Sequence, residues 1–167
     1  MTARSTAPLE PEVPRERATL AVIRAGLLAI FVLGSIGILG ELLLIDHVED
    51  PWQRVPIFLI IASVVILVWH GFERRPLSLR FFQGTLVLFV LAGGLGLLLH
   101  FRGNLEFELE NLPPLTGWPL VWAALRGATP TLAPGAMMQL GLIGLAYTFR
   151  HPVLRGEPQP RTGAPEG

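Results

Sequence analysis

The sequence predicts an all-α integral membrane protein with four transmembrane helices in an up-down bundle. The chain is 51% hydrophobic and only 16% charged, whereas an ordinary soluble domain carries about 25% charged residues. Its mean hydropathy is +0.53. The apolar residues gather in four long runs, and none of the runs shows the alternation typical of a barrel strand.

Each apolar run is suited to a membrane-crossing helix. A helix needs about 20 apolar residues to cross a hydrocarbon core of about 30 Å. Prolines bound the later runs, with Pro56 near the start of the second, Pro134 at the start of the fourth and Pro152 after its end. The first run is too long for the core of a secretory signal and no small-x-small cleavage site follows it. We therefore expect helices at residues 20–46, 55–71, 81–101 and 132–150.

The remaining segments predict two tails and one short helix. Residues 1–18 and 152–167 combine prolines with mixed charge, which is typical of disordered tails. A long loop at 102–131 contains the stretch GWPLVWAALRG, with Trp118, Trp122 and Leu125 three or four residues apart. That spacing predicts a short amphipathic helix at about 118–127, lying in the membrane interface with its tryptophans at headgroup depth.

The arginines predict how the chain is oriented. All 13 basic residues are arginine, and ten of them fall on the side that would hold both termini. Because cytoplasmic segments carry the excess of positive charge, we expect both termini in the cytoplasm and the chain in a bacterial inner membrane. The ten are Arg4, Arg15, Arg17, Arg24, Arg74, Arg75, Arg80, Arg150, Arg155 and Arg161.

Composition excludes several classes of chemistry. The chain has no cysteine, which excludes disulfides, thiolate catalysis and iron–sulfur clusters, and no lysine, which excludes Schiff-base chemistry. Neither a GxSxG nucleophile motif nor a GxGxxG phosphate loop is present. The net charge is zero, so no nucleic-acid partner is expected.

Glu41 is the polar residue of the first run that most needs an explanation. Burying a carboxylate costs several kcal/mol unless it is paired or protonated. One interpretation is a proton- or ion-binding group open to the outer side. The other is a carboxylate paired with an interface arginine, Arg54 or Arg102. Gln83 and Gln139 raise a milder form of the question, and we expect them to form hydrogen bonds between helices.

Further acids and histidines follow Glu41 on the outer side. Histidine and carboxylates together can bind zinc, manganese or iron. The tight spacing of a motif such as HExxH is missing, however, and such residues are ordinarily solvated at an interface, so no metal is expected. The stretch NLEFELEN would place Glu106, Glu108 and Glu110 on one face of an extended segment. The candidate proton or ion site consists of Glu41, Asp46, His47, Glu49, Asp50 and His100.

The four histidines allow one cofactor hypothesis. His47 and His100 end the first and third helices on the outer side, while His70 and His151 end the second and fourth on the inner side. Each pair is diagonal in an up-down bundle and could supply two axial ligands to a haem. All four histidines lie at helix ends instead of within the apolar span, so no cofactor is expected.

Glycines recur three residues apart along three of the runs. Small residues let helices approach closely where lipid provides no hydrophobic drive for association. Two interpretations stay open, namely packing within the chain and contact with a partner subunit. The glycines are Gly34, Gly37, Gly40, Gly93, Gly96, Gly141 and Gly144.

Together these patterns favour a small polytopic membrane protein that acts as a structural or accessory subunit of a membrane assembly. Its expected partners are the lipid bilayer and either further copies of itself or another membrane subunit. The alternatives are a proton- or ion-conducting or transporter component built on Glu41 and the acidic outer rim, and a membrane metal or haem redox protein.

Overall fold

A computed structural model shows a helical protein across the residues it describes, 12–46, 48–111 and 115–156. Three of its helices, α1, α2 and α3, are long and apolar enough to cross a membrane. The chain is therefore a helical protein of the membrane type. The helices are α1 (Glu12–Leu44), α2 (Pro51–Glu73), α3 (Pro76–Asn111), α4 (Gly117–Leu125), α5 (Gly135–Thr148) and α6 (Pro152–Arg155).

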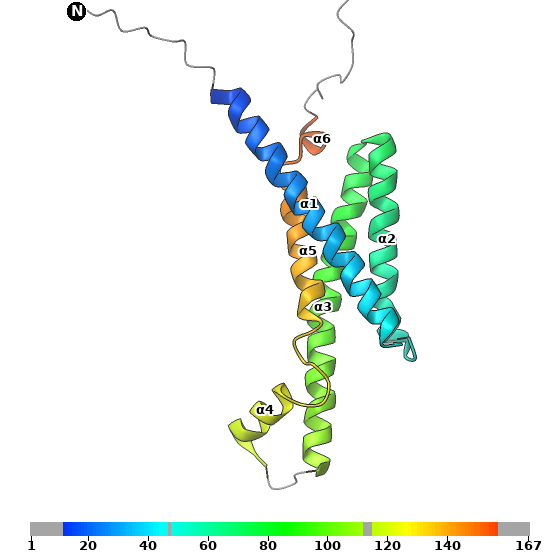
Figure 1. Cartoon of the computed structure of the whole chain (residues 1–167), viewed down its shortest axis with the longest axis vertical. Coiled ribbons are helices and arrows are strands. Elements are labelled where there is room, and N and C mark those ends of the chain that lie inside the picture. The colour runs from blue at the N-terminus through cyan, green and yellow to red at the C-terminus, as the bar shows by residue number, and fades with distance from the viewer. Residues whose placement is uncertain (1–11, 47, 112–114, 157–167) are drawn as a thin grey trace, which may run out of the picture.

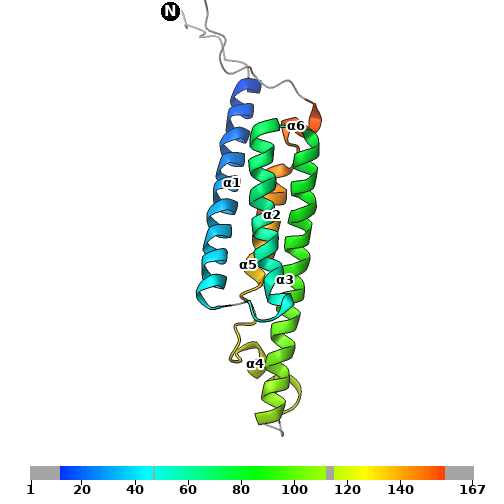
Figure 2. The ribbon, with the colours of Figure 1, turned by 90° about the vertical axis from the view of Figure 1, so that its right-hand side faces the viewer.

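The longest helix, α3, is the centre of the structure. It contacts α2 and α5 along its first two thirds and α4 near its end, while α1 crosses the other long helices at an angle (Figure 1). The beginning of α1 and the short helix α6 lie at the same end of the molecule (Figure 2). Three phenylalanines join α1 to α3. The ring of Phe31 lies 5.4 Å from that of Phe82 and 5.6 Å from that of Phe89, and all three are fully buried.

Glycines bring α3 and α5 into backbone contact. A Cβ atom on Gly93 would lie 2.6 Å from the backbone nitrogen of Met138, and one on Gly141 would lie 2.8 Å from the carbonyl oxygen of Leu86. Gly96 similarly faces Pro134. These positions have no room for a side chain, so close packing of α3 on α5 requires glycine there.

The fourth predicted helix, 132–150, is shorter in the structure. α5 has 14 residues and, at about 1.5 Å per residue, a length of about 21 Å. Residues 131–134 form turns before it, with Gly135 N–H donating to Leu132 at 2.9 Å. At the other end Phe149 is extended and Arg150 has a φ of 49°. The helix has ended two residues before His151, whose own helical conformation is disfavoured because Pro152 follows it.

The third helix is longer than predicted. The sequence predicts an end at 101, with NLEFELEN extended, but α3 continues as helix to Asn111. Arg102 and Glu106 pair at 2.8 Å across one helical turn, and the Asn111 amide donates to the carbonyl of Phe107 at 2.8 Å. Because the segment is helical, Glu106, Glu108 and Glu110 do not line one extended face. Leucine and glutamate are good helix formers. The alternation of glutamates in NLEFELEN therefore does not indicate an extended segment.

The other helix limits also differ from expectation. α2 begins at Pro51 because Asp50 caps it, accepting a hydrogen bond from Trp52 N–H at 2.8 Å, and a capping box with Gln53 completes the start. α1 begins at Glu12 and so includes part of the predicted tail.

The predicted C-terminal tail begins with structure. Residues 152–155 form α6, where Val153 is buried against the core. Most of the predicted tails, residues 1–11 and 157–167, lies outside the described residues.

We predict that Gly93→Ala destabilises the protein, whereas Gly84→Ala does not. The added methyl group of the first variant would meet backbone atoms of α5, which cannot move aside as a side chain can. Overpacking of this kind costs about 1–3 kcal/mol. Gly84 lies on the same helix, and a Cβ atom added there would have nothing within 4 Å. Thermal unfolding in detergent, followed by tryptophan fluorescence, compares the two. Equal melting temperatures would contradict the α3–α5 contact described above.

Candidate functional site

A cluster of polar side chains lies where α2, α3 and the end of α5 meet. His70 and Ser78 are buried, and the Nδ1 atom of His70 lies 2.7 Å from the Ser78 hydroxyl. That hydroxyl donates to the Arg75 carbonyl at 2.8 Å. Because the Ser78 hydroxyl uses its own proton in that bond, its oxygen accepts a hydrogen bond from His70. His70 therefore carries a proton on Nδ1. This contact ties the end of α2 to the start of α3.

His151 completes the cluster from the segment after α5. Its ring lies 5.9 Å from that of His70 and 5.4 Å from that of Tyr147. Its Nδ1 accepts from Val153 N–H at 3.4 Å and caps α6. Burial, together with the nearby Arg24 charge and then His70, lowers the pKa of His151 to about 4. His151 is therefore neutral at pH 7, and its neutral form carries the proton on Nε2.

This cluster borders a groove between α1 and α2. The hollow has a volume of about 380 Å³. Leucines and valines of the two helices, including Leu28 and Val68, form its walls. His70, Gly71 and Tyr147 line it as well. An apolar groove thus ends at polar side chains at one end of the protein.

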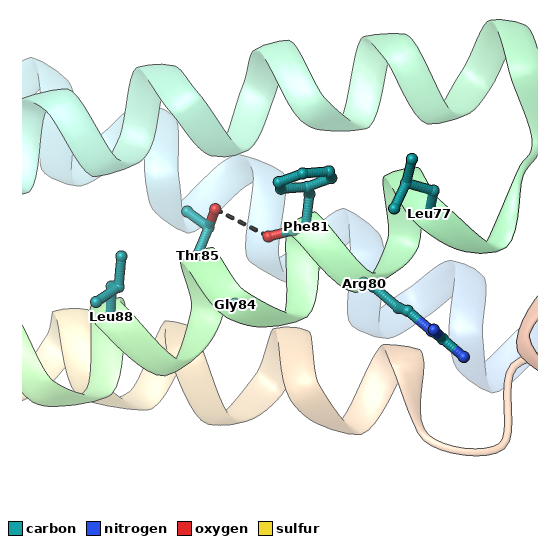
Figure 3. A pocket seen from close by; sticks show the side chains of 6 residues that line it. All are labelled: Leu77, Arg80, Phe81, Gly84, Thr85 and Leu88. Atoms are coloured by element: carbon teal, nitrogen blue, oxygen red, sulfur yellow. Dashed lines mark hydrogen bonds between the residues drawn. The ribbon is translucent and has the colours of Figure 1, made fainter.

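A larger hollow of about 500 Å³ lies along the surface of α3 near its start (Figure 3). All six lining residues belong to that one helix, and the hydroxyl of Thr85 bonds back to the Phe81 carbonyl at 3.1 Å. Since the hydroxyl is already satisfied within its own helix, Arg80 is the one charged side chain in an otherwise apolar lining.

At the opposite end of the protein Glu41 is exposed. Of the described side chains, none forms an ion pair with it. The two arginines considered as partners are engaged elsewhere, because Arg54 donates to the Val48 carbonyl at 2.8 Å and Arg102 pairs with Glu106. Gly37 and Gly40 lie on the same part of α1, and a Cβ atom added at either would have nothing within 4 Å. Among the described residues, Glu41 is thus an unpaired carboxylate on an uncovered helix face.

The rest of the candidate outer site is dispersed. Asp50 caps α2, the backbone N–H of Glu49 donates to Gln53 at 3.0 Å, and the Nδ1 atom of His100 lies 3.2 Å from the Pro130 carbonyl oxygen. Asp46 is exposed in the turn after α1, with a φ of 51°, and His47 lies outside the described residues. Within residues 12–46, 48–111 and 115–156, no three histidine or acidic side chains gather as metal ligands would.

The predicted packing residues divide into two groups. Gly34, Gly93, Gly96, Gly141 and Gly144 lie against neighbouring helices, whereas Gly37 and Gly40 face open space. Gln83 forms the expected bond between helices, donating to the Thr148 hydroxyl at 3.1 Å. Gln139 is exposed.

Asn104 is a central residue that the sequence analysis missed. It is 2% exposed, and its amide nitrogen donates to the Ala124 carbonyl at 3.0 Å, the Thr129 carbonyl at 2.7 Å and the Thr131 hydroxyl at 2.9 Å. Its oxygen accepts from the N–H and the hydroxyl of Thr129. A Cβ on Gly127 would lie 2.5 Å from this side chain. Asn104 thereby fixes α4 and the following loop against the end of α3.

No protein family, curated protein or solved structure matches the chain in the comparisons made.

We predict that Asn104→Ala loosens α4 and lowers the free energy of unfolding by roughly 3 kcal/mol, because each buried polar group left without a partner costs about 1–3 kcal/mol. Asn111→Ala is the matched control, since Asn111 is exposed and bonds only within its own helix. Denaturant unfolding monitored by the fluorescence of Trp118 and Trp122 measures both. An Asn104→Ala variant as stable as the control would show that the network does not hold α4.

Proposed function

We propose that the protein is a structural or accessory subunit of a membrane assembly, and that a partner helix packs on the outer half of α1. The observation that carries the proposal is one uncovered face that combines Gly37, Gly40 and Glu41. The same glycine spacing on α3 and α5 supports backbone contact within the chain. The uncovered pair on α1 offers a partner the same kind of surface.

The position of α1 supports this proposal. Of the three long helices, α1 has the smallest share of buried residues in its apolar span. Leu33 is 69% exposed and Leu44 is 86% exposed on either side of the glycines. A partner helix can therefore approach along this stretch without displacing any neighbour within the described part of the chain.

Glu41 adds an ionisable group to the uncovered face of α1. A carboxylate near the apolar part of a membrane is costly unless another group pairs with it. The described part of the chain supplies no such group, so the expected partner presents a hydrogen-bond donor at the level of Glu41. This requirement would make the association specific.

We further propose four membrane crossings, with residues 132–150 as the fourth. α5 supplies the helical part, and the turns at 131–134 supply the remainder. Non-helical backbone is tolerated at membrane depth where protein covers it and satisfies its polar groups. Within these turns the N–H groups of Ala133 and Gly135 donate to the carbonyls of Pro130 and Leu132 at 3.1 and 2.9 Å, which satisfies those polar groups. Because the start of α1 and α6 lie at one end (Figure 2), an even number of crossings is consistent with the helix arrangement.

The arginines support an orientation with this shared end in the cytoplasm. We therefore infer that both termini are cytoplasmic, in the inner membrane of a bacterium, and that α4 lies on the outer side. Trp118 and Trp122 of α4 are 71% and 52% exposed, which suits an interfacial helix with its tryptophans at headgroup depth.

Proton or ion conduction is the second candidate function, because an unpaired carboxylate on a membrane helix is also a proton-binding group. The described interior beside α1 is largely apolar, being occupied by Phe31, Phe82, Phe89 and Leu86, with the Ser35 hydroxyl as a single buried polar group of α1. Conduction would therefore require several copies of the chain, with the pathway between them.

We predict that the full chain, purified in mild detergent, retains a stoichiometric membrane partner that mass spectrometry identifies. Gly37→Leu should remove that partner, because the leucine fills the space a second helix would occupy. It should not disturb the fold, since a Cβ there meets nothing within 4 Å. Gly84→Leu is the control on α3. Glu41→Gln, which keeps a hydrogen-bond acceptor, should leave the partner bound and the assembly active.

Other results of that experiment are equally informative. If Gly37→Leu and Gly40→Leu both keep the partner, the interface is not on this face of α1. If only copies of the chain co-purify, and Glu41→Gln abolishes a pH-dependent flux in liposomes, the conduction function replaces the accessory one.

We predict the following labelling pattern for the proposed orientation, using single cysteines in this cysteine-free chain. Glu49→Cys and Thr116→Cys should react with an impermeant maleimide on intact cells, whereas Arg75→Cys should react only after the membrane is opened. All three native residues are exposed. Reaction of Arg75→Cys alone on intact cells would invert the orientation, and a different reactivity of Glu49→Cys and Thr116→Cys would contradict the number of crossings.

A further inference from the structure

The groove between α1 and α2 persists because the two helices barely touch. The contacts of α1 are concentrated on α5, and Gly71 adds no side chain to the α2 wall of the groove. A Cβ at Gly71 would meet nothing within 4 Å. The groove volume of about 380 Å³ falls within the range of about 300–1,000 Å³ that is typical of ligand pockets.

The walls of the groove suit a hydrocarbon chain. Leu28 and Val32 of α1 face Val64 and Val68 of α2 across it. The groove is an opening between helices, unlike the hollow in Figure 3, which a single helix lines. An extended acyl chain therefore finds apolar surface on two sides.

Arg24 brings a positive charge near the polar end of the groove, where its guanidinium donates to the Arg150 carbonyl at 3.0 Å. His70 and Tyr147 reach its lining, and Arg24 lies one helical turn beyond Leu28, close enough to Tyr147 and His151 to act on both electrostatically. Residues 15–24 and 70–80 each contain three arginines and one glutamate, and residues 147–155 contain two arginines and no acid. An anionic group is the complementary ligand for this end.

We propose that the groove binds one anionic phospholipid, with an acyl chain between α1 and α2 and the phosphate at the arginine-rich end near Arg24. Basic sites between membrane helices are suited to anionic headgroups. A zwitterionic headgroup would bring its own positive charge close to Arg24, so we expect the site to prefer an anionic headgroup. The groove itself binds the acyl chain. The inference is independent of the partner proposed for the outer half of α1.

Native mass spectrometry tests the lipid directly, with the full chain released from micelles holding equal amounts of phosphatidylglycerol and phosphatidylcholine. One phosphatidylglycerol should be retained in preference to phosphatidylcholine by at least about tenfold, the change in affinity expected for one hydrogen bond between charged groups. Gly71→Leu, which fills the groove, should lower that binding by a similar factor. Gly84→Leu, an equally open glycine on α3, should leave it unchanged.

Two further variants separate the charge from the groove. Arg24→Lys keeps the positive charge and should keep the preference for phosphatidylglycerol. Arg24→Gln keeps a hydrogen-bond donor and should lose most of that preference. Val64→Trp fills the groove from the middle of α2, and it replaces Gly71→Leu if circular dichroism shows that the latter does not fold.

Three results would overturn the proposal. The first is equal retention of phosphatidylglycerol and phosphatidylcholine by the unmodified chain. The second is undiminished phosphatidylglycerol binding in folded variants with a filled groove. The third is binding of glycerol 3-phosphate that Gly71→Leu leaves unchanged, because this would identify a site for free phosphate instead of a lipid.

Discussion

The backbone contact between α3 and α5 is the interaction on which the rest of the structure depends. α5 has 14 residues, and lipid provides no hydrophobic drive for helix association. Its attachment therefore rests on van der Waals packing at short range. Gly93 of α3 and Gly141 of α5 allow that range, because each faces backbone atoms of the other helix. Replacing either helix surface by larger side chains would separate the helices and loosen everything that α5 positions.

Both ends of the protein are organised from this contact. At one end it brings Thr148 to Gln83 and leads the chain to His151, beside His70. At the other end it returns residues 129–131 to α3, where Asn104 binds them. Gln83 and Asn104, both on α3, thus form hydrogen bonds with the chain at the two ends of the apolar contact. Polar bonds of this kind fix orientation and register, whereas the glycine packing supplies proximity.

The helical membrane class could be predicted because long apolar runs leave few alternatives in 167 residues. The limits of the helices could not, since they depend on local bonds. α3 continues past the apolar stretch because the Arg102–Glu106 pair and the packing around Asn104 stabilise a polar helical extension. The alternation of NLEFELEN had suggested an extended segment there instead. The sequence also could not predict which glycines pack against another helix of the chain. Gly34 and Gly37 belong to the same repeat, yet Gly34 faces Leu140 and Gly37 faces open space. The burial of Asn104 has no local sequence signal, as its partners lie 20 or more residues away.

The proposed partner and the proposed lipid both bind α1, and the way that helix packs explains why. α1 joins the other helices through a small region centred on Phe31 and Gly34, where aromatic rings and a close approach to Leu140 hold it. On one side of this region it diverges from α2 and leaves a groove, and on the other it leaves Gly37 and Glu41 uncovered. Arg24 also donates to the Arg150 carbonyl at 3.0 Å, which holds the start of α1 near the end of α5. The same helix therefore borders the groove proposed for the lipid and presents the face proposed for the partner.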